Sequence, residues 1–330
     1  MLEKEVIDFE KSIVVGIVTQ NQSEEKLKEY LDELEFLTYT AGGTVIKRFS
    51  QKMDKPNPKT FVGTGKLEEI KYFIKDNDIK TVIFDDELTP SQSKNITKEL
   101  DCKVLDRTNL ILDIFAQRAE TSYARTQVEL AQCQYLLPRL TRLWTHLERQ
   151  KGGIGLRGPG ETQLETDKRL ISVRIKNINK RLDKVHKQHD LGRKSRIKNQ
   201  LPMISLAGYT NAGKSTLFNL LTRAEVYADD KLFATLDSTI RRVILPASGE
   251  AVIADTVGFI QDLPHELVEA FKSTLEETRQ ANVLLHVVDA SDPNNRDKIE
   301  QVEDIIEQIE AQDIPKIIVM NKIDGIADFK

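Results

Sequence analysis

Two different hydrophobic periods divide the first two thirds of the chain. Up to about residue 117, short apolar runs rich in β-branched residues alternate with stretches in which apolar residues recur at helical spacing. Strands that alternate with helices are typical of a parallel sheet, so we expect a small α/β domain over residues 1–117. The predicted strands are residues 13–18, 44–46, 81–84 and 103–105, and the predicted helices are residues 24–39, 66–75 and 91–100.

The middle third has heptad spacing instead. One seam runs through Leu130, Cys133, Leu137, Leu140, Trp144 and Leu147, and a second through Leu164, Ile171, Ile175, Ile178, Leu182 and Val185. Residues 151–160, which are rich in glycine, separate the seams, and we expect Pro138 to interrupt and kink the first helix. Two helices joined by so short a connection should pack antiparallel, so we predict a helical hairpin over residues 118–200.

Charge is divided unevenly along the chain. The net charge of the whole chain is −4, whereas residues 139–200 contain 17 Lys and Arg against 6 Asp and Glu, a net charge of +11. Such a segment is either a solvated helical spacer or a surface that binds a polyanion. The five glycines between the seams, together with Lys151 and Arg157, favour RNA contact, because glycine lets the backbone approach phosphates closely.

Composition indicates the cellular compartment in which the protein is expected. The two cysteines, Cys102 and Cys133, show neither metal-ligand nor redox spacing, which is typical of a reducing compartment. No run of about eighteen apolar residues occurs, and the amino terminus is charged. We therefore expect a cytoplasmic protein that does not span a membrane, and a monomer is the expected state.

A buried strand, a loop and a helix follow one another from residue 203. The loop has the Walker A pattern, in which glycines let backbone NH groups surround a β-phosphate. Lys214 would neutralise the β- and γ-phosphates, and the Ser215 hydroxyl would ligate Mg²⁺. The expected nucleotide contacts are Gly208, Tyr209, Thr210, Asn211, Ala212, Gly213, Lys214, Ser215 and Thr216.

Two later motifs distinguish a GTPase from other classes of P-loop enzyme. A strand ends at Asp255, which should hold Mg²⁺ through water, and the NH group of Gly258 can reach a γ-phosphate oxygen. A further strand, residues 316–320, leads to Asn-Lys-x-Asp, where the Asp324 carboxylate can accept two hydrogen bonds that guanine offers and adenine does not. Asn321 should brace the loop and contact the base, and the stem of Lys322 should cover its face. The expected contacts are Asp255, Thr256, Val257, Gly258, Asn321, Lys322, Ile323 and Asp324.

These motifs predict a P-loop GTPase domain with a mostly parallel sheet over residues 201–330, with GTP as the substrate. One alternative is a P-loop phosphotransferase that acts on a small molecule, which the Asn-Lys-x-Asp motif disfavours. The other is a helical RNA-binding protein whose nucleotide site is only structural. Phe259 stands where Ras-like enzymes carry the glutamine that orients water, so we expect slow intrinsic hydrolysis.

Taken together, the motifs resemble the HflX family of translation-factor-related GTPases over essentially the whole chain. The matching segments are residues 106–108, 127–131, 137–140, 152–155, 157–165, 233–237 and 255–259. The resemblance implies a first switch with Thr235 as a second hydroxyl ligand of Mg²⁺, and catalytic roles for Lys214, Thr235 and Gly258. The first switch comprises Phe233, Ala234, Thr235, Leu236 and Asp237.

Asn211 stands where an asparagine helps to hold K⁺ in some related GTPases, and simple variation of the loop is the open alternative.

The resemblance also implies partners. It implies a bacterial factor that binds the large ribosomal subunit and its rRNA, places the glycine-rich tip near the peptidyl-transferase centre, and separates stalled ribosomes into subunits. It further implies ATP binding by the amino-terminal domain. Because the chain stops six residues after Asp324, before the fifth GTPase motif, we expect a G domain without its last strand and helix. The strand at residues 316–320 would then be an open, apolar edge.

Overall fold

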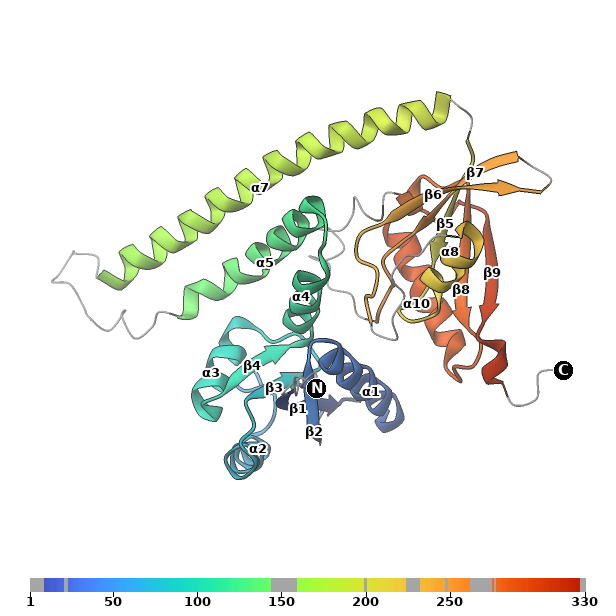
Figure 1. Cartoon of the computed structure of the whole chain (residues 1–330). Helices are drawn as coiled ribbons and strands as arrows, with labels where there is room; N and C mark the ends of the chain where they lie inside the picture. Colours follow the sequence, from blue (N-terminus) through green and yellow to red (C-terminus); the bar gives the residue numbers. More distant parts are fainter. Residues whose placement is uncertain are drawn as a thin grey trace, which may run out of the picture. The chain divides into compact units, whose positions relative to one another are not determined.

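The computed structural model describes residues 9–20, 23–143, 159–198, 201–223, 232–246, 249–261, 275 and 277–326. These residues form two compact units. The first comprises Met1–Ile114 with Cys133–Val173, and the second comprises Phe115–Gln132 with Arg174–Lys330. Figure 1 labels the helices and strands of both units.

A four-stranded sheet is the centre of the first unit. Its order is β2-β1-β3-β4, and every neighbouring pair is parallel, as predicted for an α/β domain. All three predicted helices are present, and the helix α4, which was not predicted, follows β4 directly. The strands are β1 (Glu10–Val18), β2 (Gly43–Lys52), β3 (Thr81–Phe84) and β4 (Lys103–Asp106), and the helices are α1 (Glu24–Thr40), α2 (Thr64–Asn77), α3 (Pro90–Leu100) and α4 (Arg107–Arg118).

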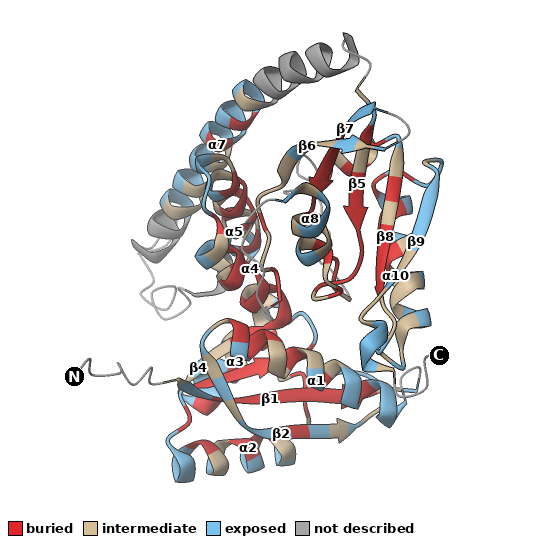
Figure 2. Ribbon diagram, turned by 45° about the vertical axis from the view of Figure 1, so that its right-hand side comes forward, coloured by how far each residue is buried: buried red, intermediate tan, exposed pale blue. Residues whose placement is uncertain are grey.

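Differences in burial explain why the edge strand β2 is much longer than the predicted strand at residues 44–46. Every side chain of β1 after its first two residues is buried, as a central strand requires (Figure 2). β2 pairs only with β1 and exposes most of its side chains, which include Lys47 and Arg48. An edge strand has little apolar signal, so only residues 44–46 were predicted where Gly43–Lys52 form the strand.

Two long helices occupy the middle of the chain, α5 (Ser122–Leu143) and α7 (Pro159–Lys198). α5 continues through Pro138, so this residue does not end the helix. On α7 the second predicted seam is the less exposed stripe, with Ile178 and Leu182 buried. Within the second unit, the Nε atom of Arg174 on α7 donates to Glu129 Oε1 on α5 at 2.6 Å. Trp144, Leu147 and the tip at 151–158 lie outside the described residues, as does the side chain of Leu164.

The second unit contains a five-stranded sheet of order β6-β7-β5-β8-β9. Only the pair β6–β7 is antiparallel, so the predicted mostly parallel sheet of a P-loop GTPase domain is confirmed. Because β5, β7, β8 and β9 run in the same direction, the loops that follow them meet at one edge of the sheet. The elements are β5 (Met203–Ala207), α8 (Lys214–Thr222), β6 (Thr239–Leu245), β7 (Gly249–Asp255), β8 (Val283–Asp289), α10 (Asn295–Gln308), β9 (Lys316–Asn321) and the 3₁₀ turn η1 (Ile323–Gly325).

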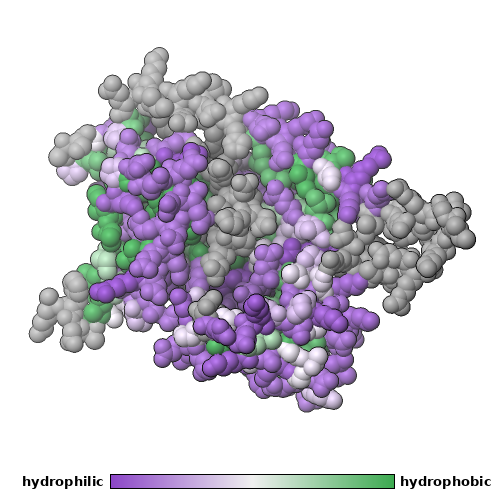
Figure 3. All heavy atoms as spheres, turned by 180° about the vertical axis from the view of Figure 1, so that it is seen from behind, coloured by the Kyte–Doolittle hydropathy of each residue, from purple (hydrophilic) through white to green (hydrophobic). Residues whose placement is uncertain are grey.

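The outer strand β9 carries exposed apolar side chains. Ile317 and Ile318 are 55% and 54% exposed, and β9 is at the edge of the described sheet. On the face seen in Figure 3, hydrophobic patches are scattered over a mostly hydrophilic surface. Among the described residues, no helix has the length and apolar content needed to cross a membrane.

Candidate functional site: a nucleotide cavity at the carboxyl ends of the strands

The loop between β5 and α8 is shaped around a site for phosphate. α8 begins at Lys214, and its cap Gly213 has a φ of 92°, a left-handed conformation that favours glycine. A side chain at Gly213 would also collide with the amide nitrogen of Asn321. The first residues of α8, Lys214, Ser215 and Thr216, line the cavity, and a helix amino terminus in this place favours an anion.

Lys214 is buried beneath this loop. Its Nζ atom donates to the carbonyl oxygens of Gly208 at 3.1 Å and Tyr209 at 2.8 Å. Burial lowers the pKa of Lys214 to about 8, although the charge of Asp255 opposes the shift. Carbonyl groups compensate a buried ammonium only in part, so the position suits an additional anion.

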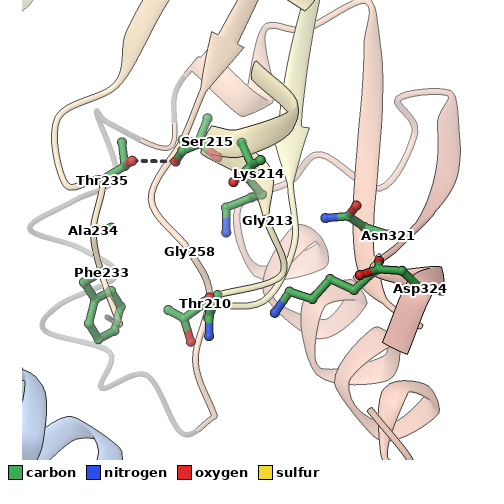
Figure 4. A pocket seen from close by; sticks show the side chains of 14 residues that line it. Thr210, Gly213, Lys214, Ser215, Phe233, Ala234, Thr235, Gly258, Asn321 and Asp324 are labelled. Carbon is green, nitrogen blue, oxygen red and sulfur yellow. Dashed lines mark hydrogen bonds between the residues drawn. The ribbon is translucent and has the colours of Figure 1, made fainter. Parts of the chain in front are cut away.

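Three oxygens from three segments converge beside Lys214. Ser215 Oγ lies 2.8 Å from Thr235 Oγ1 and donates to Asp255 Oδ2 at 2.7 Å, and Thr235 Oγ1 lies 3.1 Å from the same oxygen. Figure 4 shows Ser215 and Thr235 facing each other across this point. Hydroxyl and carboxylate oxygens are the ligands that Mg²⁺ prefers.

The buried carboxylate of Asp255 tests whether this cluster suits a cation. The residue is 0% exposed, and its Oδ1 atom has no hydrogen-bond partner among the described residues. Burial raises the pKa of Asp255, while the hydrogen bond from Ser215 and the charge of Lys214 oppose the rise. A buried carboxylate with one unsatisfied oxygen is costly without a cation, so these residues fit Mg²⁺.

The loop after β7 is attached to the phosphate loop. Thr210 N donates to the Phe259 carbonyl at 2.7 Å, and Phe259 N donates to the Gly208 carbonyl at 3.1 Å. Gly258 lies so close that a Cβ atom there would be 2.8 Å from Thr210 Cα. Tyr209 strengthens the connection, because its hydroxyl oxygen accepts a hydrogen bond from Gln261 N at 2.9 Å. Gly258 is therefore held against the loop that surrounds the phosphates.

The Asn-Lys-x-Asp motif occupies the other end of the cavity. Asn321 Nδ2 donates to the Ala212 carbonyl at 2.9 Å, so Asn321 braces the phosphate loop. Lys322 Nζ lies 2.9 Å from Asp289 Oδ2, which fixes the lysine side chain. Figure 4 shows Asn321 and Asp324 on the side of the cavity opposite Thr235. A ligand that spans the cavity would thus meet the phosphate-binding groups at one end and the Asp324 carboxylate at the other.

The cavity has a volume of ≈ 530 Å³, which is in the range of small-molecule sites. All of its lining residues were candidates from the sequence. They are Thr210, Asn211, Gly213, Lys214, Ser215, Thr216, Phe233, Ala234, Thr235, Thr256, Gly258, Asn321, Lys322 and Asp324. Eight further candidates are not among the lining residues, namely Gly208, Tyr209, Ala212, Leu236, Asp237, Asp255, Val257 and Ile323.

Two of those eight have other surroundings. The side chain of Leu236 is buried, and the carboxylate of Asp237 accepts hydrogen bonds from Glu120 and Thr121 instead of facing the cavity. Thr121 and Asp289, which lies beside Lys322, belong to none of the sequence motifs. A threonine before a helical run is a recognisable helix cap, but no local pattern links it to a residue 116 positions away.

A phosphate loop, an Asp-x-x-Gly loop and an Asn-Lys-x-Asp motif that share one cavity above a parallel sheet define a P-loop GTPase. Family models agree along the chain. The model described as GTP-binding GTPase N-terminal matches residues 28–116, that described as GTP-binding GTPase Middle Region matches residues 118–196, and that described as 50S ribosome-binding GTPase matches residues 203–322.

Individual relatives identify the family. The GTPase HflX of Flavobacterium psychrophilum is 62% identical over 325 residues, which cover 98% of this chain and 78% of that protein. The GTPase HflX of Escherichia coli is 54% identical over 97% of this chain and 75% of its own length. The chain belongs to the HflX GTPase family, and it is therefore a GTP-binding, GTP-hydrolysing enzyme.

Solved structures with a similar fold come from more distant proteins. A complex of SsGBP and GDP is 27% identical, with a TM-score of 0.55, over 97% of this chain and 84% of that one. A GTP-binding protein from the hyperthermophilic archaeon Sulfolobus solfataricus, in complex with GDP, is 26% identical, with a TM-score of 0.51, over 97% and 85% of the two chains. Both support the predicted fold class.

Proposed function

We propose that this chain is a Mg²⁺-dependent GTPase that acts on the large ribosomal subunit and separates stalled ribosomes into subunits. The observation that carries the proposal is the meeting of the three motifs at one cavity of ≈ 530 Å³. The two similar structures that contain GDP support a guanine nucleotide as its ligand.

Each group at the cavity has a proposed role. Lys214 and the NH groups at the start of α8 bind the β- and γ-phosphates, and the NH group of Gly258 binds a γ-phosphate oxygen. Asp324 accepts hydrogen bonds from the guanine ring, while Asn321 and Lys322 shape the base site. The other predicted contact residues on the three motif loops hold these groups in place through their backbone.

Ser215, Thr235 and Asp255 are the proposed Mg²⁺ residues, with Asp255 acting through water. When bound, Mg²⁺ would neutralise charge on the phosphates during transfer of the γ-phosphoryl group. The unsatisfied Oδ1 atom of Asp255 supports this assignment, because a water on the ion would satisfy it.

Ribosome binding is proposed for the basic middle segment. We assign residues 1–117 to an α/β domain, 118–200 to the helical hairpin and 201–330 to the G domain. The +11 charge of residues 139–200, from 17 Lys and Arg against 6 Asp and Glu, supports contact with rRNA. The matching family model, described as 50S ribosome-binding GTPase, supports the large subunit as the partner. We propose that the protein acts as a monomer in the cytoplasm.

Co-sedimentation with ribosomal subunits tests this proposal. Binding to large subunits should be strongest with a non-hydrolysable GTP analogue, weaker with GDP, and steeply dependent on salt. Replacement of residues 152–160 by a tight turn should weaken subunit binding and leave GTP affinity intact. Equal binding in all nucleotide states, or an unchanged effect on ribosomes after the replacement, would refute it.

Phe259 motivates a second test. Its side chain is 1% exposed, and a phenyl ring can neither orient water nor accept a proton. In related enzymes, completion of such a site by a partner raises turnover by roughly 10³ to 10⁵. Single-turnover hydrolysis should therefore increase by at least about tenfold when large subunits are added, a threshold set well below that range. No increase while binding is intact would place the catalytic group elsewhere in the chain.

Asn211 supports a K⁺ site, since it lines the cavity from within the phosphate loop, where its φ of 58° is left-handed. Hydrolysis should be faster in KCl than in NaCl at equal ionic strength. Asn211→Ala should remove the difference. Identical rates for the wild type in the two salts would contradict a K⁺ site.

A further inference from the structure

The Asp237 carboxylate of the first switch accepts hydrogen bonds from residues at the start of α5. Glu120 N and Thr121 N each donate to Asp237 Oδ2 at 3.1 Å, and the Thr121 hydroxyl donates to Asp237 Oδ1. Thr121 also caps α5, because Ala124 N donates to Thr121 Oγ1 at 3.0 Å. A negative charge at a helix amino terminus is favourable, so this contact stabilises both the switch and the helix.

An aromatic contact fastens the other end of the switch. The rings of Phe115 on α4 and Phe233 meet edge to face, with centroids 4.7 Å apart and an interplanar angle of 87°. Both side chains are almost fully buried. Phe233 has a φ of 54°, which is unfavourable for a bulky side chain, so packing against Phe115 is needed to hold this conformation.

Thr235 lies midway between the two attachments. Its hydroxyl is the group that meets Ser215 Oγ at 2.8 Å and Asp255 Oδ2 at 3.1 Å (Figure 4). With Phe233 fixed on one side and Asp237 on the other, the chain between them has little freedom to carry Thr235 away. All of these residues belong to the second compact unit, although Phe115 and Thr121 lie more than 100 positions before the switch in sequence.

We propose that Phe115 and Thr121 are positioning residues for GTP hydrolysis, which hold Thr235 at the Mg²⁺ site through Phe233 and Asp237. This inference rests on the proposed role of Thr235. The connection acts in both directions, since two sites that share a coupling free energy influence each other equally. Occupation of the site by GTP would therefore stabilise the start of α5, the first helix of the proposed hairpin.

The test separates hydrolysis from binding in the full chain. Asp237→Ala removes all three hydrogen bonds to the switch, and Thr121→Val removes the one from the hydroxyl together with the cap that this hydroxyl gives Ala124 N. Each should slow single-turnover GTP hydrolysis, by about 10- to 100-fold for Asp237→Ala, because small misplacement of a reacting group costs up to about 10²-fold. The affinity for GDP should change by less than about twofold, since in such enzymes the switch contacts the γ-phosphate and its Mg²⁺.

Three controls keep the result specific. Thr121→Ser retains the hydroxyl and should keep most of the wild-type rate. Asp304→Asn removes an exposed carboxylate of α10 in the same unit and should have no effect. The double variant Asp237→Ala/Thr121→Val should have nearly the rate of Asp237→Ala, because both changes break the same connection between Asp237 and Thr121.

Thr235→Ala distinguishes failure of the inference from failure of the proposed function. If Thr235→Ala slows hydrolysis but Asp237→Ala and Thr121→Val do not, the positioning role is refuted and the Mg²⁺ assignment stands. If Thr235→Ala has no effect, the Mg²⁺ assignment itself is wrong. Equal weakening of GDP and GTP-analogue binding by Asp237→Ala would show a merely structural contact and overturn the proposal.

Discussion

Asp106 and Asp255 end strands of the two parallel sheets, and both carboxylates are buried, yet their surroundings differ. Both oxygens of Asp106 are satisfied by the protein, with bonds from Leu88 N at 3.1 Å, Asn109 N at 2.9 Å and the Tyr135 hydroxyl at 2.9 Å. Asp255 has hydrogen bonds on Oδ2 but none on Oδ1 from the described residues.

The difference separates a structural carboxylate from one that awaits a ligand. Asp106 joins β4 to the starts of α3 and α4 and to α5, so its hydrogen bonds stabilise the first unit. The second unit leaves a buried carboxylate with an incomplete set of partners, also at the carboxyl end of a strand. A folded protein tolerates such groups mainly where binding supplies what the fold omits.

The largest expected effect is at the base end of the open site. Asp324→Asn should weaken GTP binding by about 10²- to 10⁴-fold, because two hydrogen bonds to a charged group contribute about 1.5–3 kcal/mol each. The variant should prefer xanthine nucleotides, whose ring carbonyl can accept from the new amide. Titration with fluorescent GDP, xanthosine diphosphate and ADP checks this, with Asp304→Asn as the control. Equal affinity of the wild type for guanine and adenine nucleotides would contradict the assignment.

Asp255→Asn should separate function from stability. Hydrolysis should fall by about 10²- to 10³-fold, the usual cost of removing one preorganised charge-stabilising group. Thermal stability of the nucleotide-free protein should stay the same or increase, because a buried charge with an unsatisfied oxygen is removed. Rapid-quench kinetics and calorimetry measure the two effects. Substantial loss of stability would mean that Asp255 is as structural as Asp106.

Asp106→Asn is the matched change in the first sheet. An amide would set an NH₂ group against other donors, so the free energy of unfolding should fall by about 1–3 kcal/mol. GTP affinity and hydrolysis should remain close to those of the wild type. Urea denaturation measures the fall in the free energy of unfolding, and hydrogen exchange in β4 and α5 locates it. A large fall in hydrolysis at full stability would break the contrast between the two carboxylates.

The smallest expected effect concerns His286 in the middle of the second sheet. Its Nδ1 atom is buried, has no hydrogen-bond partner among the described residues, and lies 3.6 Å from Glu303 Oε1. Burial lowers the pKa of His286, although Glu303 opposes the shift. The unfolded chain therefore binds a proton first as the pH falls below its usual pKa of about 6.5, and stability falls by at most about 1.4 kcal/mol per pH unit. Melting curves between pH 5.5 and 7.5 should show this slope, and His286→Gln should flatten it.

Local patterns were sufficient for most elements of the fold. Consecutive apolar residues predicted β1, and heptad spacing predicted the buried stripe of α7 that includes Ile178 and Leu182. The pattern failed where burial was partial. The edge strand β2 exposes most of its side chains, and the outer strand β6, which pairs antiparallel with β7, exposes Arg241 and Arg242. Edge strands carry a weak apolar signal, because only one neighbour and part of one face cover them.

The sequence by itself singled out every residue that lines the candidate nucleotide cavity. The chemistry of Lys214, Asp255 and Asp324 depends on short motifs whose spacing is fixed by one loop each, and such spacing is visible in a linear sequence. Only the tertiary structure decided what holds the first switch in place. The contact of Asp237 with Thr121 joins residues 116 positions apart. Contacts between distant residues depend on the packing of whole elements, and no local residue preference encodes them.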